Sequence, residues 1–395
     1  MTSAPGSLSA LRDSNRLRVI EAVQQRGGAS RAELVRVTGL SRSTVSSVVG
    51  DLLAERVLVE QHDQPDTAPA GSVGRPATQL TLNPDIGALV GVHLRHDGVR
   101  VAVADVAGTL RAESLGELDV DHHAHEAIGY VLDQVPALLA QAATDERRLL
   151  GVGVAVSAPM GPGPAWQWRG VDVVSELGTA LGVPVQLDND ANLGSMAEWI
   201  FGAGRGADDL VYVMMADGVG AGLIVDGRVY RGAHGSAGEL GHVVVNPDGQ
   251  VCRCGSRGCL ETVSGTEALT ASLRHSYGPD VTVRGILDLV AAGDPGACRA
   301  VADAGRAAGK ALAGICAVLD PRLVVVGGHL AAAGAPLLDG VREELLRWLP
   351  PSLGNGLTVL AGQLGARAEV LGAIAMAGRQ QPARTFADLV TGAAS

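Results

Sequence analysis

Residues 239–261 have the sequence ELGHVVVNPDGQVCRCGSRGCLE, and this stretch decides how the chain is interpreted. It holds one histidine and three cysteines, and imidazole nitrogen and thiolate sulfur are ligands that zinc prefers in proteins. Four such side chains in one short loop suit a closed, tetrahedral structural site. The sequence therefore predicts a structural Zn²⁺ ion bound by His242, Cys252, Cys254 and Cys259.

The alternative is a loop of free, reactive thiols. Three cysteines cannot all be paired in disulfides, and Cys252 and Cys254 lie too close in sequence for both to bridge Cys259 without strain. The two remaining cysteines, Cys298 and Cys316, lie in alanine-rich stretches of helical character, which predicts small buried side chains.

Length and composition exclude several classes of protein. A chain of 395 residues has room for two or three domains with a buried core. Because the net charge is -11, the body of the protein cannot bind nucleic acid, so any such contact is confined to one module. No apolar stretch reaches membrane-spanning length and no leader pattern opens the chain, so we expect a cytoplasmic protein without a membrane partner.

Residues 1–84 carry the pattern of a winged helix-turn-helix domain. Ser30 begins a helix with Glu33 three residues later, which is a capping box, and Gly39 ends that helix. Ser41 caps the next helix, and two helices around a glycine-containing turn indicate a helix-turn-helix. The outward face of the later helix carries short hydroxyl donors and one guanidinium, which suit phosphates and base edges. We therefore predict DNA contacts from Arg42, Ser43, Thr44, Ser46 and Ser47.

A two-stranded wing is expected from the alternating patterns in 57–60 and 78–82, with Gly74-Arg75-Pro76 in its loop. The proline holds Arg75 extended, which suits insertion into a minor groove, so Arg75 is a further predicted DNA contact. The local charge is only slightly positive, so one copy would bind weakly, and we expect a homodimer or homotetramer that reads paired half-sites of operator DNA. The alternative is a small helical bundle that docks a partner.

The rest of the chain predicts two related α/β lobes. In residues 85–188, three strand-like runs precede a helical run and a buried strand, which is the opening of an actin-like, ribonuclease-H-like lobe. Residues 189–365 repeat the hairpins and add a long helix and a buried strand. A helix at about 366–379 is expected to pack back on the first lobe, and 380–395 form a tail. The expected strands are 89–94, 99–104, 109–115, 150–156, 210–215, 221–225, 228–230 and 323–326, and the expected helices include 127–143 and 297–319.

Groups suited to a polyhydroxyl ligand follow the strand expected at 185–187. An aspartate at a strand end can accept a proton from a hydroxyl, and an adjacent asparagine can hydrogen-bond another. The predicted ring of polar groups consists of Asn189, Asp190, Glu239, His242 and Glu261. Residues 217–222 form a glycine-rich turn that resembles a phosphate loop, but a strand follows it, which excludes the dinucleotide-binding fingerprint.

Residues 235–242 and 252–261 resemble the signature of the ROK family, which comprises bacterial repressors, open reading frames and sugar kinases. Residues 188–192, DNDAN, are similar to its sugar and catalytic-base motif, and the helix-turn-helix with Gly-Arg-Pro resembles its repressor branch. The resemblance covers residues 15 to 378 approximately and implies a sugar-kinase-type actin-like fold. It also implies sugar contacts and zinc ligation by the same side chains that the residue pattern singles out.

One departure from the family pattern bears on activity. Kinases of this family begin the first lobe with an aspartate, an apolar residue and Gly-Gly-Thr, whose amides meet the nucleotide phosphates. Here His93 replaces the aspartate, Arg95 and His96 replace the glycines, and Asp97 would repel phosphate. The Pro-Gly expected at the sugar cleft is also altered, to SAPM at 157–160. Loss of phosphate and Mg²⁺ positioning removes most of what catalyses phosphoryl transfer.

We therefore expect a sugar-responsive repressor of carbohydrate uptake or metabolism genes, with no enzyme activity and with Asp190 as a ligand contact rather than a base. Its expected partners are operator DNA and a small sugar. The main alternative is a sugar kinase of this family that carries an accessory DNA-binding head. A third is a ligand-free scaffold that uses the fold for dimerisation.

Overall fold

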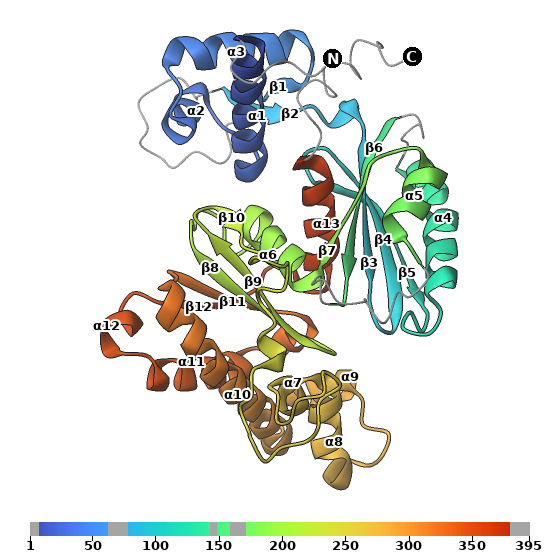
Figure 1. The fold of residues 1–395 in the computed structure, drawn as a ribbon, viewed down its shortest axis with the longest axis vertical. Coiled ribbons are helices and arrows are strands. Elements are labelled where there is room, and N and C mark those ends of the chain that lie inside the picture. The colour runs from blue at the N-terminus through green and yellow to red at the C-terminus, as the bar shows by residue number, and fades with distance from the viewer. Residues whose placement is uncertain (1–7, 62–77, 143–147, 159–170, 380–395) are drawn as a thin grey trace.

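The protein consists of a small head and two α/β lobes (Figure 1). The computed structural model describes residues 8–61, 78–142, 148–158 and 171–379. Arg75, the predicted wing loop around it and the predicted tail at 380–395 lie outside the described residues. Among the described helices, none is both long enough and apolar enough to cross a membrane.

The head is a helix-turn-helix followed by an antiparallel strand pair. Local sequence explains its helix ends: Ser30 Oγ accepts from the Glu33 amide, and the Glu33 carboxylate accepts from the Ser30 amide at 2.8 Å, which confirms the expected capping box. Gly39 ends the helix in the left-handed region, at φ 65°, where a side chain would be strained. The elements are α1 (Leu8–Arg26), α2 (Arg31–Thr38), α3 (Arg42–Ala54), β1 (Leu58–Gln61) and β2 (Gln79–Leu82).

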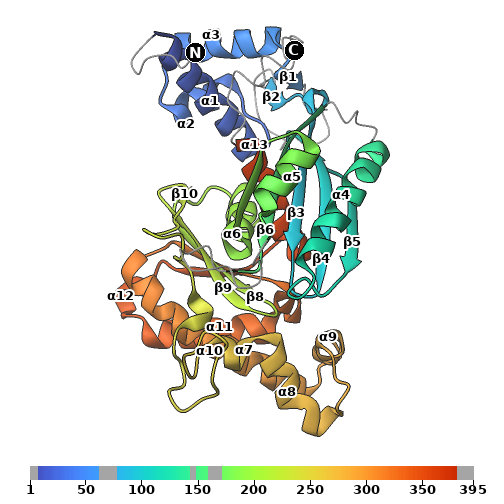
Figure 2. The same cartoon turned by 45° about the vertical axis from the view of Figure 1, so that its right-hand side comes forward.

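The first lobe is built on a five-stranded sheet of order β5-β4-β3-β6-β7. Its first three strands are antiparallel neighbours, and the last two pair in parallel, as in an actin-like lobe. Helices α4 and α5 cover one face of this sheet and α13 lies on the other (Figures 1 and 2). The bounds are β3 (Ala88–Leu94), β4 (Gly98–Asp105), β5 (Leu110–Glu117), α4 (Ala124–Gln141), β6 (Leu149–Val156), α5 (Val173–Leu181), β7 (Val185–Asn189) and α13 (Ala368–Arg379).

The second lobe repeats this topology, with strand order β10-β9-β8-β11-β12. Helix α6 packs on one face of the sheet, and α10 with α11 covers the other. Helices α7, α8 and α9 lie at the end of the molecule farthest from the head (Figure 2). The bounds are α6 (Asp190–Phe201), β8 (Leu210–Met215), β9 (Val219–Val225), β10 (Arg228–Val229), α7 (Glu261–Ser264), α8 (Thr266–Tyr277), α9 (Val283–Ala291), α10 (Pro295–Leu319), β11 (Leu323–Gly327), α11 (Ala335–Trp348), α12 (Pro351–Gly354) and β12 (Thr358–Ala361).

The predicted fold class is confirmed, and the differences from expectation are local. Strand β7 runs through Asn189, one residue past the expected boundary at 188, so this residue belongs to the first sheet. The C-terminal helix begins at Ala368, after a short 3-10 turn, rather than at 366. Helix α11 and strand β12 were not among the expected elements.

Helix α13 lies so close to the first sheet that its backbone meets two glycines of the strands. A Cβ atom on Gly91 of β3 would lie 2.4 Å from the carbonyl oxygen of Val370, and one on Gly153 of β6 would lie 1.9 Å from that of Ala373. Any side chain at these two positions would therefore push the helix away from the sheet. The two glycines allow an approach that no other residue type permits.

We predict that Gly153→Ala lowers stability, because the added methyl group overlaps the Ala373 backbone; overpacking of this kind costs about 1–3 kcal/mol. Gly129→Ala is the matched control, since Gly129 is exposed within α4 and its Cβ would meet nothing within 4 Å. That change should leave stability unchanged or raise it by about 0.5–1 kcal/mol. Urea unfolding of both variants tests the packing, and equal stability of the two would contradict it.

Candidate functional site

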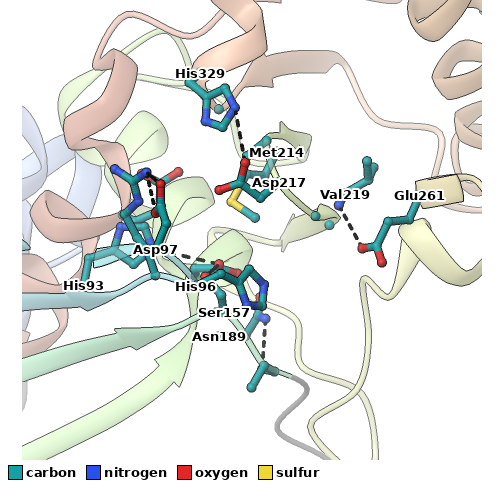
Figure 3. A pocket seen from close by; sticks show the side chains of 18 of the residues that line it. His93, His96, Asp97, Ser157, Asn189, Met214, Asp217, Val219, Glu261 and His329 are labelled. Carbon is teal, nitrogen blue, oxygen red and sulfur yellow. Dashed lines mark hydrogen bonds and ion pairs between the residues drawn. The ribbon is translucent and has the colours of Figure 1, made fainter. Parts of the chain in front are cut away.

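A cavity of about 720 Å³ lies between the two lobes (Figure 3). Its walls come from the β3–β4 turn, the β7–α6 junction, the β8–β9 turn, the start of α13 and the segment that precedes α7. The structure brings all five residues of the predicted polar ring to this cavity: Asn189, Asp190, Glu239, His242 and Glu261.

Asp190 is the first residue of α6 and is buried, with 3% of its surface exposed. Its Oδ2 accepts a hydrogen bond from Ser157 Oγ at 2.5 Å, and its Oδ1 accepts from the amide of Ala191 at 2.8 Å. The positive end of the helix dipole favours a negative charge at this position. A buried carboxylate is thereby held at the cavity wall.

Asn189 has a structural task that the sequence analysis missed. Its Oδ1 caps α6 by accepting from the amides of Ala191 and Asn192, at 2.9 and 3.3 Å. Its Nδ2 donates to the carbonyl of Ala158 at 3.2 Å, which leaves one amide hydrogen for a ligand. The side chain therefore fixes the start of α6 as well as lining the cavity. The signal was present in the sequence, since asparagine is among the preferred N-cap residues.

Asp188 is close to this position in sequence but has a different role. Its buried Oδ2 lies 2.6 Å from a guanidinium nitrogen of Arg231, which comes from the second lobe just after β10. Its Oδ1 accepts from Asn192 Nδ2 at 3.0 Å. The Asp188 carboxylate thus forms an ion pair between the two lobes and does not line the cavity.

Two further carboxylates face the cavity from the second lobe. Glu261 is held by Arg253, whose Nε lies 3.0 Å from Oε1, and by the amide of Val219, which donates to Oε2 at 3.3 Å. Burial raises the pKa of Glu239, and the neighbouring carboxylates of Asp190 and Glu261 add to this effect, whereas nearby His242 opposes it. Ligand hydroxyl groups could donate hydrogen bonds to the carboxylate oxygens of Glu239 and Glu261 and so stabilise these neighbouring acceptors.

The four predicted metal ligands also come together. Their ligand atoms all lie within 4.8 Å of one another, with 3.6 Å between Cys252 Sγ and His242 Nδ1 and 3.7 Å between Cys254 Sγ and Cys259 Sγ. A tetrahedral zinc ion with Zn–S bonds of ~2.3 Å would space two thiolates ~3.8 Å apart. Burial and hydrogen bonds to the adjacent thiols raise the pKa of Cys259 to about 12. A cation would reverse this shift, so the donor set fits a metal ion.

The cavity extends to the stretch where phosphate binding would be expected. There the Arg95 guanidinium lies 2.7 Å from Asp97, so the charge of Asp97, which was expected to repel phosphate, is offset by its neighbour. His96 Nδ1 lies 2.9 Å from Asp121. Across the cavity, the β8–β9 turn contributes Asp217, whose Oδ1 accepts from Thr266 Oγ1 at 2.8 Å.

Taken as a whole, the lining has more negative than positive groups. Three guanidinium groups line the cavity, from Arg95, Arg253 and Arg284. They face six carboxyl groups, from Asp97, Asp190, Asp217, Glu239, Glu261 and Glu369. Burial raises the pKa of Glu369, although nearby His93 opposes the shift. Such a lining favours a neutral, hydroxyl-rich ligand over a triphosphate.

The predicted DNA-contacting face is presented to solvent. Arg42 and the serines of α3 in the prediction are exposed, Thr44 is half-buried, and Val45, Val48 and Val49 point into the core of the head. Four other arginines of the head pair with carboxylates, whereas Arg42 has no ion-pair partner among the described residues. Its guanidinium is therefore available to a phosphate or a base.

Charged and polar residues that line the cavity but were not predicted from the sequence include Glu369, Arg253, Arg284 and His329. Glu369 is the second residue of α13 and is buried between apolar neighbours, and a lone carboxylate in such a helix was the signal available. Arg253 lies between two of the cysteines, so the loop that brings the metal ligands together also directs this guanidinium to Glu261.

Comparison with known sequences gives two family matches. The pattern of the ROK family matches residues 91–380, and that of the MarR family matches residues 13–67. A xylose repressor from Bacillus spizizenii is 28% identical over 369 residues, which cover 91% of this chain and 93% of the relative.

Comparison with solved structures gives neighbours of two kinds. A ROK family transcriptional regulator, homologous to the E. coli MLC protein, has a TM-score of 0.74 at 23% identity and covers 97% of this chain and 98% of its own. A ROK family glucokinase from Streptomyces griseus, in complex with glucose and AMPPNP, has a TM-score of 0.64 at 27% identity. That match covers 73% of this chain and 99% of the glucokinase, so the kinase has no counterpart for the head.

Proposed function

Because the chain belongs to the ROK family, we propose that it is a sugar-responsive, DNA-binding transcriptional repressor of carbohydrate uptake or metabolism genes. One observation carries the proposal: a single chain joins a cavity lined by the predicted sugar contacts to a helix-turn-helix with an exposed face. The match to a xylose repressor along nearly the whole chain supports it. Operator DNA and a small sugar are the partners in this proposal.

The effector in this proposal is a neutral monosaccharide. Asp190, Glu239 and Glu261 offer acceptors for its hydroxyls, Asn189 offers a donor, and His242 stands beside them at the metal cluster. A few convergent polar groups in a largely preformed cavity are typical of small-ligand sites. The excess of carboxyl groups in the lining gives no support to an anionic effector.

A structural zinc ion at His242, Cys252, Cys254 and Cys259 is part of the proposal. It would hold the loop whose two ends carry Glu239 and Glu261. Binding energy of a structural metal is shared with local folding, so the ion would fix two of the sugar contacts without touching the sugar. A closed set of four protein ligands leaves no position for catalysis.

A sugar kinase is the second candidate, and the glucokinase similarity favours it. Asp190 is present, and so is the glycine-rich segment 217–222, most of which lies within β9 because that strand begins at Val219, two residues before the expected start. Two observations disfavour a kinase. The side chains of Arg95 and His96 occupy the β3–β4 turn, where kinases of this family use glycines whose backbone amides bind the nucleotide phosphates, and the cavity lining carries more carboxyl groups than guanidinium groups. We therefore propose that the protein is not an enzyme and that Asp190 binds a sugar hydroxyl without deprotonating it for transfer.

Two helices connect the cavity with the head. Helix α6 starts at Asp190 in the cavity and packs on α1, and just after it Arg205 donates to the carbonyl of Arg26, the last residue of α1, at 2.8 Å. Helix α13 starts beside the cavity and ends at Arg379, whose guanidinium lies 5.0 Å from the ring centre of Trp199 on α6. A sugar that favours one angle between the lobes would therefore also shift the head.

In a homodimer or homotetramer, such a shift would change the spacing of paired DNA-binding heads. The operator half-sites have a fixed spacing, so a change in distance weakens binding to both at once. A coupling free energy of about 1–3 kcal/mol would change operator affinity by roughly 5- to 150-fold.

We predict that Cys254→Ser lowers zinc content and the sugar response together. Cys254 is exposed, so the change removes a ligand without disturbing the core. Zinc measured by mass spectrometry and the sugar-induced rise in melting temperature should both fall. Cys298→Ser, which lies outside the cluster, is the control and should preserve both. Unchanged zinc content in Cys254→Ser would refute the ligand assignment.

We predict that Arg42→Ala weakens DNA binding about tenfold, the range expected for loss of one base or phosphate contact. The probe is a duplex that the wild-type protein selects from a random-sequence pool, and affinity is measured by fluorescence anisotropy. Arg322→Ala, an exposed position in the second lobe, is the control and should bind as the wild type does. Equal binding by the two variants would contradict the assignment of the α3 face.

We predict that glucose, xylose and N-acetylglucosamine each fail to stimulate ADP release from Mg·ATP. Because the side chains of Arg95 and His96 stand where kinases of this family carry glycines, turnover should remain far below about 1 per second, the lower end for typical enzymes. A coupled assay for ADP checks this. Turnover above that value would establish the kinase candidate instead.

A further inference from the structure

His93 is a buried imidazole without a hydrogen-bond partner among the described residues. Only 6% of its surface is exposed, and neither ring nitrogen has a hydrogen-bond partner among the described residues. Burying a polar group without a hydrogen bond costs free energy, so such a group calls for an explanation. The ring lines the cavity between the lobes, which suggests that a ligand supplies the missing partner (Figure 3).

Strand geometry explains where the ring points. Alternate residues of β3 face opposite sides of the sheet, and Val90, Val92 and Leu94 join the core beneath α4. His93 therefore shares with Gly91 the face that meets α13, at the end of the strand where the cavity opens. Its closest acidic group is Asp190, whose Oδ2 lies 3.9 Å from His93 Nε2.

A distance of 3.9 Å is too long for a direct hydrogen bond but suits a bridging hydroxyl. An oxygen ~2.8 Å from both atoms would make an angle of about 90° between them, about 20° less than the tetrahedral angle between a hydroxyl's O–H bond and its lone pair, and hydrogen bonds tolerate a bend of that size. A hydroxyl can accept from Nε2–H and donate to Asp190 at the same time, whereas the carboxylate can only accept. Asp190 already accepts from Ser157, which limits how far it can turn toward the ring.

We infer that His93 is a sugar-contacting residue, whose Nε2–H donates to a ligand hydroxyl that in turn donates to Asp190. The inference rests on the proposed sugar-binding function and adds a contact from the first lobe. The other charged contacts, Glu239 and Glu261, come from the second lobe. Through the bridging hydroxyl, the ligand joins β3 to the first residue of α6, the helix that leads to the head.

The test uses two amides of different length. The Nε2 of glutamine can occupy the place of imidazole Nε2, whereas the Nδ2 of asparagine reaches only the place of Nδ1. His93→Gln should bind sugar within about twofold of the wild type, and His93→Asn should bind about fivefold or more weakly, as loss of one buried hydrogen bond predicts. Calorimetric titration with D-glucose, D-xylose and N-acetyl-D-glucosamine at pH 7.5 measures the affinities.

His93→Leu separates a binding role from a structural one. Removing a buried polar group that has no hydrogen-bond partner among the described residues should not lower the melting temperature of the sugar-free protein, while sugar affinity falls. A structural role would give the opposite, a lower melting temperature with unchanged affinity. His125→Leu, at an exposed position outside the cavity, controls for loss of an imidazole.

The outcomes distinguish this inference from the function on which it rests. If the wild type binds one of the three sugars and His93→Asn binds it equally well, the inference is overturned and the proposed function stands. Equal weakening by Gln and Asn also overturns it, because a packing defect would act on both. If the wild type binds none of the three, the proposed sugar response itself fails.

Discussion

The structure depends on the backbone contact of α13 with its three neighbours. The helix lies against β3 and β6 through Gly91 and Gly153, and a Cβ on its own Gly372 would meet the carbonyl oxygen of Leu193 in α6 at 1.9 Å. It is thereby wedged between the sheet of the first lobe and a helix of the second. Because close-packed interiors transmit displacement, a shift of α6 cannot occur without a response from α13. Both helices begin at the cavity, so a molecule bound there would lie beside the first turn of each.

Local signals in the sequence predicted the local features. The capping box at Ser30, the left-handed Gly39 and the strand pair of the head depend on neighbouring residues, and the chain order alone carries that information. The internal repeat of strands was also visible, because both lobes use continuous apolar runs. Strand β12 was missed because it is short and only partly buried, so its alternation of apolar and polar residues is weak. Helix α11 was missed although its buried residues Leu337, Val341 and Leu345 recur at helical spacing.

The five residues expected around the ligand do line the cavity, but their hydrogen bonds and ion pairs were not predicted. The five ring residues, with Asp190 and without Asp188, were named from the sequence, but no sequence pattern offered a physical reason why these two aspartates on either side of Asn189 should differ. Only the three-dimensional arrangement shows that Asp188 meets Arg231 while Asp190 faces the cavity. The roles of His93 and Glu369 depend on residues far away in the chain, and no local pattern encodes such pairs. Electrostatic partners that are distant in the chain therefore cannot be predicted from local sequence patterns.

Helix α13 follows the whole second lobe in sequence, and this order has a consequence for synthesis. The first lobe is begun at Ala88, but the helix that covers one face of its sheet is complete only at Arg379. In a nascent chain, the face of the first sheet that α13 covers therefore remains exposed until the whole second lobe has left the ribosome. Domains generally fold as they are made, and exposed strands are prone to aggregate. The cavity between the lobes is complete only after α13 docks.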